Sequence, residues 1–323
     1  MKIIFMGTPQ FAVPIAEEIK KKHEIVLVVT QPDQYNYKKK TVTFSPVKKW
    51  AIENNLPVFQ PEKIKLEKEE VYKYEADLIV TAAFGQIIPE DMLEYPKYKS
   101  INVHGSLLPK YRGGAPIQRA IINGDAKTGI TIMYMAKKMD AGDIIRIEEL
   151  PILDSDNQDT MFAKLSELGK NMILEVIDDL EKGLVNPVKQ NEDEVTYAYN
   201  LTKEDELVNF NNDARSVFNQ IRGLNSNPGA YFKLDDLNIK VYDSFVSELT
   251  TNEKPGTIIG ISKKSFEVSC GNGTVISITE LQLPSKNKMP ARDFINGQGR
   301  KLLVIGKEIN KVDETSLFKG GNV

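Results

Sequence analysis

Short apolar runs alternate with amphipathic stretches over the first part of the chain. The run Lys2–Met6 is followed by a Gly-Thr-Pro turn and then by residues 11–22, whose apolar positions have helical spacing and whose end is basic. Two further runs, Glu24–Thr30 and Asp77–Ala83, have the pattern of buried strands. Because strands that alternate with helices form βαβ units, the pattern predicts a parallel, Rossmann-like α/β domain.

A strand pair, a long helix and an irregular stretch follow. Residues 129–135 and 143–152 indicate two strands that extend the sheet, and Met161–Lys182 has the spacing of a long amphipathic helix. From Gly183 to about Leu201 the sequence is polar and without periodicity, which is typical of a linker.

The last third of the chain is predicted to be a small β-domain. After a helix at Ala214–Arg222, short strands separated by turn residues predict an OB-like barrel. The predicted strands are Ala230–Leu234, Ile239–Val246, Gly256–Ile261, Ser265–Cys270 and Thr274–Leu281. The predicted domains are therefore a catalytic Rossmann-like domain at 1–183, a linker at 184–203, a barrel domain at 204–310 and a tail at 311–323.

Composition excludes several classes of protein. The 323 residues are 41% hydrophobic and 27% charged, an ordinary globular balance, and no window reaches the roughly 18 apolar residues of a transmembrane helix. We therefore expect a soluble, cytoplasmic protein without a membrane partner. The single cysteine, Cys270, and two histidines are too few for a disulfide or a Cys/His zinc cage, and the first turn lacks the G-x-G-x-x-G spacing of NAD or FAD sites.

Net charge is −3, but the basic residues are unevenly distributed. Residues 34–52 contain five lysines and no acid, and residues 254–301 contain eight bases against three acids. Either cluster on its own is more typical of a solvated surface than of a nucleic-acid interface, because lysine is a common surface residue.

The candidate chemistry lies at the end of a predicted strand. Asn102 and His104 alternate with apolar residues just before Gly105, so both side chains share one face at the strand's carboxyl end, where open parallel sheets bind ligands. Asn offers a donor to an oxyanion, and His holds or moves a proton near neutral pH. Asp140 or Asp143, between the two later strands, is a candidate to orient the imidazole, and the spacing does not choose between them. His23, after a helix-ending lysine run, is expected to be a surface residue.

The strand-end pair belongs to a longer motif, Asn102-Val-His104-Gly-Ser-Leu-Leu-Pro109, followed by Arg112-Gly and later by Asp140. This motif resembles the active-site signature of the folate-dependent formyltransferases. Further motifs, spread from residue 3 to about residue 303, occur in the order typical of the methionyl-tRNA formyltransferases. They include Gly7-Thr8-Pro9, Gln31-Pro32-Asp33, Phe84-Gly85-Gln86, Asp140-Ala-Gly-Asp143, Asn227-Pro228-Gly229 and Pro255-Gly256-Thr257.

The resemblance implies formyl transfer from 10-formyltetrahydrofolate to the α-amino group of methionine on initiator tRNA, without a metal. Two distinct domains that flank the acceptor arm of the tRNA are compatible with a monomer. It implies a catalytic triad of Asn102, His104 and Asp140, in which Asp140 holds His104. The positions implied for folate binding are Phe84, Gly85, Gln86, Ile87, Ser106, Leu107, Leu108, Pro109 and Asp143. Those implied for tRNA contacts are Lys38, Lys39, Lys40, Arg222, Lys286 and Lys288.

The loop at residues 33–45 departs from the family's pattern. Lys38 stands where relatives usually carry arginine, which keeps the charge but loses the fork for bidentate contacts. The alternative function is a folate-dependent sugar-nucleotide N-formyltransferase, which shares the triad and can also carry a C-terminal β-domain. The two basic clusters favour tRNA. A silent binding module is a further alternative, against which the intact triad argues.

Overall fold

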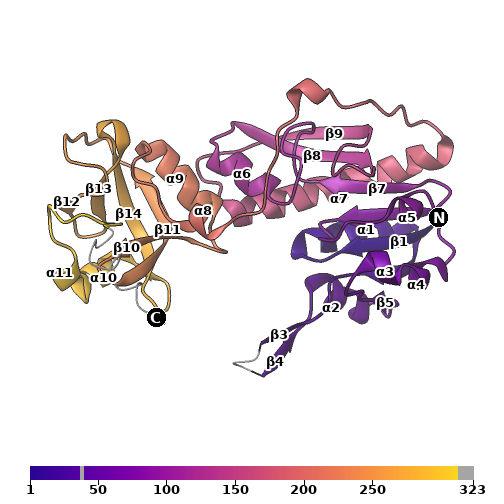
Figure 1. Ribbon diagram of the computed structural model, residues 1–323, viewed down its shortest axis with the longest axis horizontal. Coiled ribbons are helices and arrows are strands. Elements are labelled where there is room, and N and C mark those ends of the chain that lie inside the picture. The colour runs from indigo at the N-terminus through magenta and orange to yellow at the C-terminus, as the bar shows by residue number, and fades with distance from the viewer. Residues whose placement is uncertain (37–39, 312–323) are drawn as a thin grey trace, which may run out of the picture. The chain divides into compact units, whose positions relative to one another are not determined.

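The computed structural model describes residues 1–36 and 40–311, which form two compact units (Figure 1). The N-terminal unit comprises residues 1–117, 126–153 and 160–200, and the C-terminal unit comprises residues 118–125, 154–159 and those from 201 onward. The domain bounds drawn from the sequence stay a prediction.

The N-terminal unit is built on a seven-stranded sheet of order β5-β2-β1-β6-β7-β8-β9. Its first five members are parallel, β8 runs antiparallel to β7, and β9 runs antiparallel to β8. The strands are β1 (Lys2–Gly7), β2 (Glu24–Val29), β5 (Val58–Phe59), β6 (Leu78–Ala82), β7 (Ser100–His104), β8 (Lys127–Tyr134) and β9 (Ile144–Pro151). The predicted Rossmann-like sheet and its added strand pair are confirmed.

Helices pack on both faces of this sheet, as the apolar alternation predicted. On one face Gly169 of the long helix α7 approaches Val103 and Ile15 so closely that a Cβ at residue 169 would lie 2.9 Å from the Val103 side chain. On the other face Ile4 and Met6 pack in one cluster with α3, α4 and α5. The helices of this unit are η1 (Gln10–Ala12), α1 (Val13–Lys22), α2 (Pro46–Glu53), α3 (Ile64–Glu67), α4 (Glu69–Tyr72), α5 (Glu90–Leu93) and α7 (Gln158–Lys182). Most of α6 (Pro116–Ile122) belongs to the C-terminal unit.

The segment at residues 33–45, predicted as a loop, contains a β-hairpin. Strands β3 (Gln34–Asn36) and β4 (Thr41–Thr43) pair antiparallel and form a sheet of their own (Figure 1). Alternating Tyr, Val and Thr residues favour this extended pairing.

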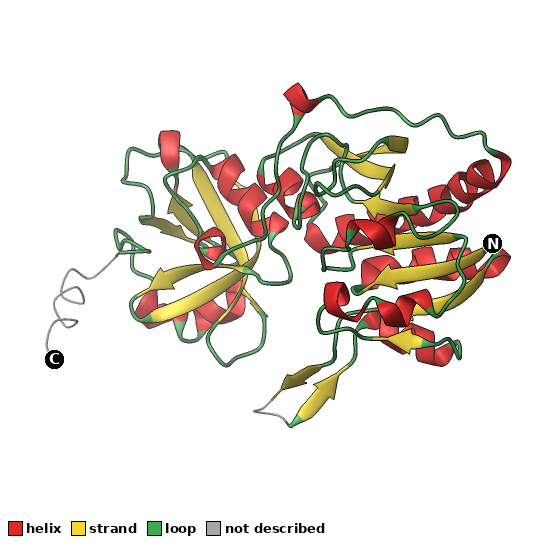
Figure 2. Ribbon diagram, turned by 45° about the vertical axis from the view of Figure 1, so that its right-hand side comes forward, coloured by secondary structure: helices red, strands yellow, loops and turns green. Residues whose placement is uncertain are grey.

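The C-terminal unit is a curled antiparallel sheet of order β10-β11-β14-β13-β12, with β15 paired to β14 (Figure 2). Such a half-barrel fits the predicted OB-like class. Its apolar faces surround a core that includes Phe232, Phe266 and Phe294. The strands are β10 (Ala230–Leu234), β11 (Leu237–Val246), β12 (Ile258–Ile261), β13 (Phe266–Ser269), β14 (Val275–Gln282) and β15 (Met289–Pro290). The helices are α8 (Lys203–Glu206), α9 (Ala214–Gly223), η3 (Gly271–Gly273), α10 (Ala291–Asn296) and α11 (Gly299–Leu302).

The stretch after α7, interpreted from its polarity as a linker, makes ordered contacts within the N-terminal unit. It contains the short helix η2 (Glu192–Glu194). The Arg112 N–H donates to the Thr196 carbonyl at 2.9 Å, and the Ala198 N–H donates to the Arg112 carbonyl at 2.8 Å. Hydrogen bonds of this kind explain how a sequence with little apolar content is held in place. Over residues 1–36 and 40–311, no helix has the length and apolarity needed to cross a membrane.

Candidate active site

Asn102 lies near the carboxyl end of β7, and Thr81 of the neighbouring strand β6 sets its orientation. The Thr81 hydroxyl donates to Asn102 Oδ1 at 2.7 Å. Because the carbonyl end of the amide accepts this bond, the Nδ2 group is left as the outward-facing donor. Sequence reasoning missed Thr81, whose only signal was a polar residue within an apolar strand.

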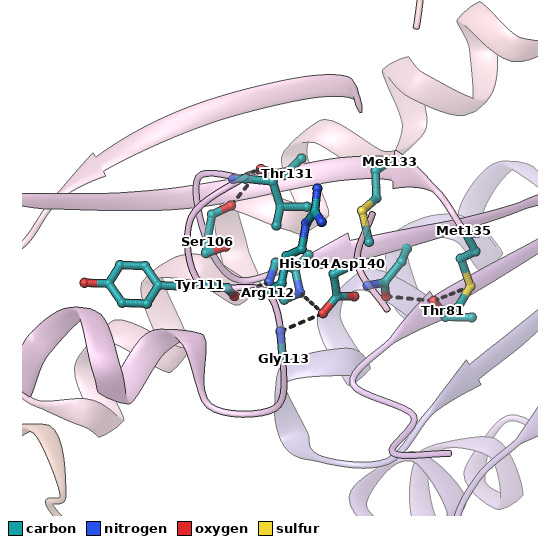
Figure 3. Close-up of polar contacts among 12 residues, drawn as sticks. Thr81, His104, Ser106, Tyr111, Arg112, Gly113, Thr131, Met133, Met135 and Asp140 are labelled. Carbon is teal, nitrogen blue, oxygen red and sulfur yellow. Dashed lines mark hydrogen bonds and ion pairs between the residues drawn. The ribbon is translucent and has the colours of Figure 1, made fainter. Parts of the chain in front are cut away.

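His104, the last residue of β7, is buried and contacted at both ring nitrogens. Its Nε2–H donates to the Tyr111 carbonyl at 3.0 Å, and its Nδ1 lies 3.7 Å from Asp140 Oδ2 (Figure 3). A carbonyl only accepts, so it fixes the proton on Nε2 and turns Nδ1 toward the carboxylate.

Asp140 is the acidic partner of His104, a choice that the spacing left open and that the family resemblance implied. Its Oδ2 accepts the Gly113 N–H at 2.8 Å as well as facing His104 (Figure 3). Asp143 instead contributes its backbone carbonyl, which accepts the Tyr134 N–H at 2.9 Å and joins the loop to β8. Asp140 has a φ of 50°, a left-handed conformation that Asp tolerates better than most residues.

Glycine is required at position 142 of the same loop. A Cβ there would lie 1.8 Å from the Tyr134 carbonyl oxygen, so no larger residue allows the loop to approach β8 this closely. The close approach explains the Asp-Ala-Gly-Asp sequence and keeps Asp140 next to the end of β7.

The residues expected to bind folate fall into structurally distinct groups. Phe84 and Leu108 are buried, whereas Ile87 is 84% exposed. The Phe84 carbonyl accepts hydrogen bonds from Thr8 and Gln31, so the segment that presents Ile87 is held firmly. The Ser106 hydroxyl donates to the Lys110 carbonyl at 2.7 Å, which makes its side chain part of the turn.

Gln86 also uses its side chain internally, since Nε2 donates to the Pro61 carbonyl and Oε1 accepts the Ile64 N–H. Gly85, with a φ of 90°, lies against the Gln31 side chain. Leu107 and Pro109 are partly exposed and belong to the turn that follows His104.

The expected tRNA contacts are only partly supported. Arg222 is 8% exposed, and its guanidinium donates to Asn219 Oδ1 and to the Asp156 carbonyl. These bonds hold the side chain inside the C-terminal unit, and its role as a phosphate contact stays a prediction. Lys286 and Lys288 are both exposed, and Lys288 pairs with Glu280 at 2.7 Å.

The basic hairpin keeps part of its predicted charge at the surface. Lys40 is exposed, whereas Lys38 and Lys39 lie outside the described residues. Lys48 is engaged by Asp33, with Nζ and Oδ2 2.5 Å apart. Burial acts to raise the pKa of Asp33, but hydrogen bonds from Lys48 and Gln60 outweigh it and lower that pKa.

His23 is less exposed than expected. It follows α1 directly, where its Nδ1 lies 3.3 Å from the N-terminal amino group, and its Nε2 is buried. Desolvation, together with that positive charge, lowers the pKa of His23. Within the described part of the chain, no group of three or more His, Cys, Asp or Glu side chains is arranged to hold a metal ion.

Family models match most of the chain. A formyl transferase model matches residues 1–177, and a formyl transferase C-terminal domain model matches residues 200–299. The methionyl-tRNA formyltransferase of Latilactobacillus sakei is 47% identical over 305 residues, 94% of this chain and 96% of that protein. The chain belongs to the methionyl-tRNA formyltransferase family.

Other members of the methionyl-tRNA formyltransferase family give the same result. The Staphylococcus aureus enzyme is 46% identical over 95% of this chain and 99% of its own length. Among solved structures, the methionyl-tRNA formyltransferase of Clostridium thermocellum has a TM-score of 0.57 at 19% identity, over 88% of this chain and 98% of that one. The sugar 3N-formyl transferase WlaRD has a TM-score of 0.66 at 21% identity, over 89% and 99% of the two chains. At these identities the structural matches show a shared fold only.

Proposed function

We propose that this protein transfers the formyl group of 10-formyltetrahydrofolate to the α-amino group of methionine on initiator tRNA, giving N-formylmethionyl-tRNA for translation initiation. The observation that carries the proposal is its identity of 45–47% to curated methionyl-tRNA formyltransferases over at least 93% of this chain. Membership of this family implies a folate-type formyl donor and a tRNA acceptor. We place its action in the cytoplasm, as a monomer.

Asn102 stabilises the oxyanion in this mechanism. Attack by the neutral amine on the formyl carbon turns the carbonyl oxygen into an oxyanion, and the bond from that carbon to N10 of the donor then breaks. With Oδ1 held by Thr81, Asn102 directs Nδ2 at the developing charge without reorganising during the reaction. Such a donor is typically worth about 2.7–4 kcal/mol of transition-state stabilisation.

His104 and Asp140 act together on charge and proton. The Nε2–H of His104 is directed at the Tyr111 carbonyl, and its Nδ1 faces Asp140. A protonated His104 therefore stabilises the oxyanion through its positive charge rather than through a hydrogen bond. The attacking nitrogen sheds a proton to Asp140, which is 14% exposed and whose Oδ2 is already held by Gly113. The proton then serves the departing N10 nitrogen.

The donor and the tRNA are bound by separate parts of the protein in this proposal. Residues 84–87, 106–109 and Asp143 line the folate site, where Leu107, Leu108 and the exposed Ile87 supply apolar contact. Lys38, Lys39, Lys40, Lys286 and Lys288 neutralise tRNA phosphates. Tyr35 and Phe44, 48% and 38% exposed, offer rings on which unpaired bases stack.

The deciding experiment measures formyl transfer from 10-formyltetrahydrofolate to purified methionyl initiator tRNA, with dTDP- and UDP-amino sugars offered in parallel. We expect formyl-methionyl-tRNA as the only product. A formylated sugar instead would identify the protein as a sugar-nucleotide N-formyltransferase and would leave the basic hairpin without its proposed role.

A single substitution tests the place of His104 in the mechanism. His104→Ala removes the positive charge beside the oxyanion, so we expect kcat to become undetectable while the Kd for tRNA stays within a few-fold. Steady-state kinetics and a filter-binding titration give the two quantities. A large loss of affinity with little change in kcat would contradict the assignment.

A further inference from the structure

We propose that Gln190, in the polar stretch after α7, is the residue that positions Asp140 for catalysis. The inference rests on the proposed formyl-transfer function for its kinetic test, and on contacts within the N-terminal unit for its physical argument. Gln190 contacts the backbone of Asp140 and no side chain of the triad. It acts on the backbone that carries Asp140.

Every donor and acceptor of the Gln190 side-chain amide has a partner in the N-terminal unit. Its Nε2 group donates to the Asp140 carbonyl and to the Gly142 carbonyl, both at 2.8 Å. Its Oε1 accepts from Nε and Nη2 of Arg112, at 3.0 and 2.8 Å. Two donors and two acceptor sites are all that a primary amide offers, so this side chain has one favourable orientation.

Arg112 provides the fixed point to which the amide is tied. Its side chain has no exposed surface, and its Nη2 also donates to Glu192 Oε1 at 2.8 Å. Hydrogen bonds from Arg112 and Lys138 lower the pKa of Glu192 to about 2, so the carboxylate stays charged and balances the buried guanidinium. A buried cation with these partners does not move to accommodate a different neighbour at position 190.

The same stretch also holds the other partner of His104. Thr196 accepts the Tyr111 N–H on its Oγ1 at 2.9 Å and the Arg112 N–H on its carbonyl, also at 2.9 Å. Tyr111 has a φ of 61°, a conformation that costs free energy for a bulky residue and persists only when its surroundings hold it. Residues 190–196 therefore set the position of both groups that contact the imidazole, Asp140 from one side and the Tyr111 carbonyl from the other.

No other side chain of the same length offers both the two donors and the acceptor that these contacts require. Glutamate keeps the acceptors for Arg112 but has no donors, so its carboxylate would face two carbonyl oxygens and repel the loop. Methionine keeps the length and loses every bond. A displacement of about 1 Å in a reacting group can cost about 10²-fold in rate, so a shift of the Asp140 loop should be measurable as a loss of kcat.

The test compares Gln190→Glu with the matched control Gln220→Glu. The first removes the bonds to the Asp140 loop and keeps an acceptor for Arg112. The second makes the same change at a glutamine of the C-terminal unit whose Nε2 also donates to two carbonyls, those of Asp205 and Leu207. We expect Gln190→Glu to lower kcat by about 10²-fold with KM for both substrates within about threefold, and Gln220→Glu to retain near wild-type kcat. Gln190→Met, which introduces no charge, should lower kcat in the same way.

A second readout does not depend on activity. The chain has two histidines, so imidazole NMR signals separate His104 from His23 without ambiguity. We expect Gln190→Glu to shift the His104 signals and leave those of His23 in place, because His23 has no contact with this stretch. Circular dichroism establishes that each variant is folded.

The outcomes separate the two hypotheses. Unchanged kcat and unchanged His104 signals in Gln190→Glu would overturn the positioning role, and so would an equal loss of kcat in Gln220→Glu. If the wild-type protein forms no formyl-methionyl-tRNA, the proposed function fails, and the His104 signals still decide whether Gln190 holds Asp140.

Discussion

At the scale of single residues, function depends on which end of a polar group is already occupied. Thr81 binds the carbonyl end of Asn102, the Tyr111 carbonyl binds Nε2 of His104, and Gly113 binds one oxygen of Asp140. Each of these contacts leaves one defined atom free to act, with Nδ2 of Asn102 facing outward and Nδ1 of His104 facing Asp140. Preorganisation of this kind costs no rearrangement when charge develops in the transition state.

Asn102→Asp tests the donor directly. The aspartate has the same shape but no N–H and carries charge of the wrong sign, so we expect kcat to fall by at least 10²–10³-fold. Thr81→Val should have a smaller effect, about 3–10-fold, because it removes one neutral hydrogen bond that orients the amide. Single-turnover kinetics at saturating donor measure both. Equal effects of the two changes, or none, would contradict the assigned orientation.

At the scale of elements, an exposed lysine of the hairpin and a partly buried ion pair between two helices have different roles. The hairpin β3–β4 carries exposed Lys40, whose interaction with a polyanion is sensitive to salt. The pair between Arg119 of α6 and Asp205 of α8, both less than a quarter exposed, is bidentate, with contacts of 2.6 and 2.9 Å. The first is suited to binding and the second to stability.

Changing Lys38, Lys39 and Lys40 to alanine should flatten the salt dependence of tRNA binding. Each phosphate contact contributes about 0.7–0.9 to the slope of log K against log salt, so three lost contacts reduce the slope by about 2–3. Binding titrations between about 50 and 200 mM salt measure this slope. Lys20, Lys21 and Lys22 at the end of α1 are the matched control triplet. An unchanged slope would remove the hairpin from the interface.

Asp205→Asn should destabilise the protein in a pH-dependent way. The hydrogen bonds from Arg119 lower the pKa of Asp205 below its ordinary value of 3.8. The stabilisation is therefore complete above about pH 4 and is lost as pH falls through the folded-state pKa. We expect a loss of about 1 kcal/mol at pH 7 that shrinks in acid. Urea unfolding at several pH values gives the difference, and a difference independent of pH would contradict the ion-pair origin.

At the scale of the whole molecule, the two units have separate cores, and the single cysteine reports on one of them. Cys270 is 1% exposed in the core of the C-terminal unit. Desolvation raises the pKa of its thiol to about 12, so almost no thiolate forms near neutral pH.

We expect Cys270 to react with a thiol reagent only when the C-terminal unit unfolds. In native buffer at about pH 8 the reaction should be slow, and in urea its rate should rise in parallel with loss of tertiary structure, to one thiol per chain. A colorimetric thiol assay beside a circular-dichroism unfolding curve tests this. Rapid labelling of the native protein would show that the core opens locally.

The sequence by itself determined the elements, the fold class and the motif that carries the chemistry. Strand and helix periodicities are local, so β1, β2, β6, α7 and the strands β10 to β14 of the C-terminal sheet could be predicted from their own residues. Asn102 and His104 could be predicted as a pair because alternation along a single strand places them on one face.

Only the tertiary structure decided which distant segments meet. The choice of Asp140 over Asp143 depends on the approach of its loop to Gly113 and β8, and the burial of Arg222 depends on its packing around Asn219 and Asp156. Gln190 had no sequence signal, because a polar residue in an aperiodic stretch looks the same whether it is solvated or fully hydrogen-bonded. Such contacts join residues tens of positions apart, and local periodicity carries no information about them.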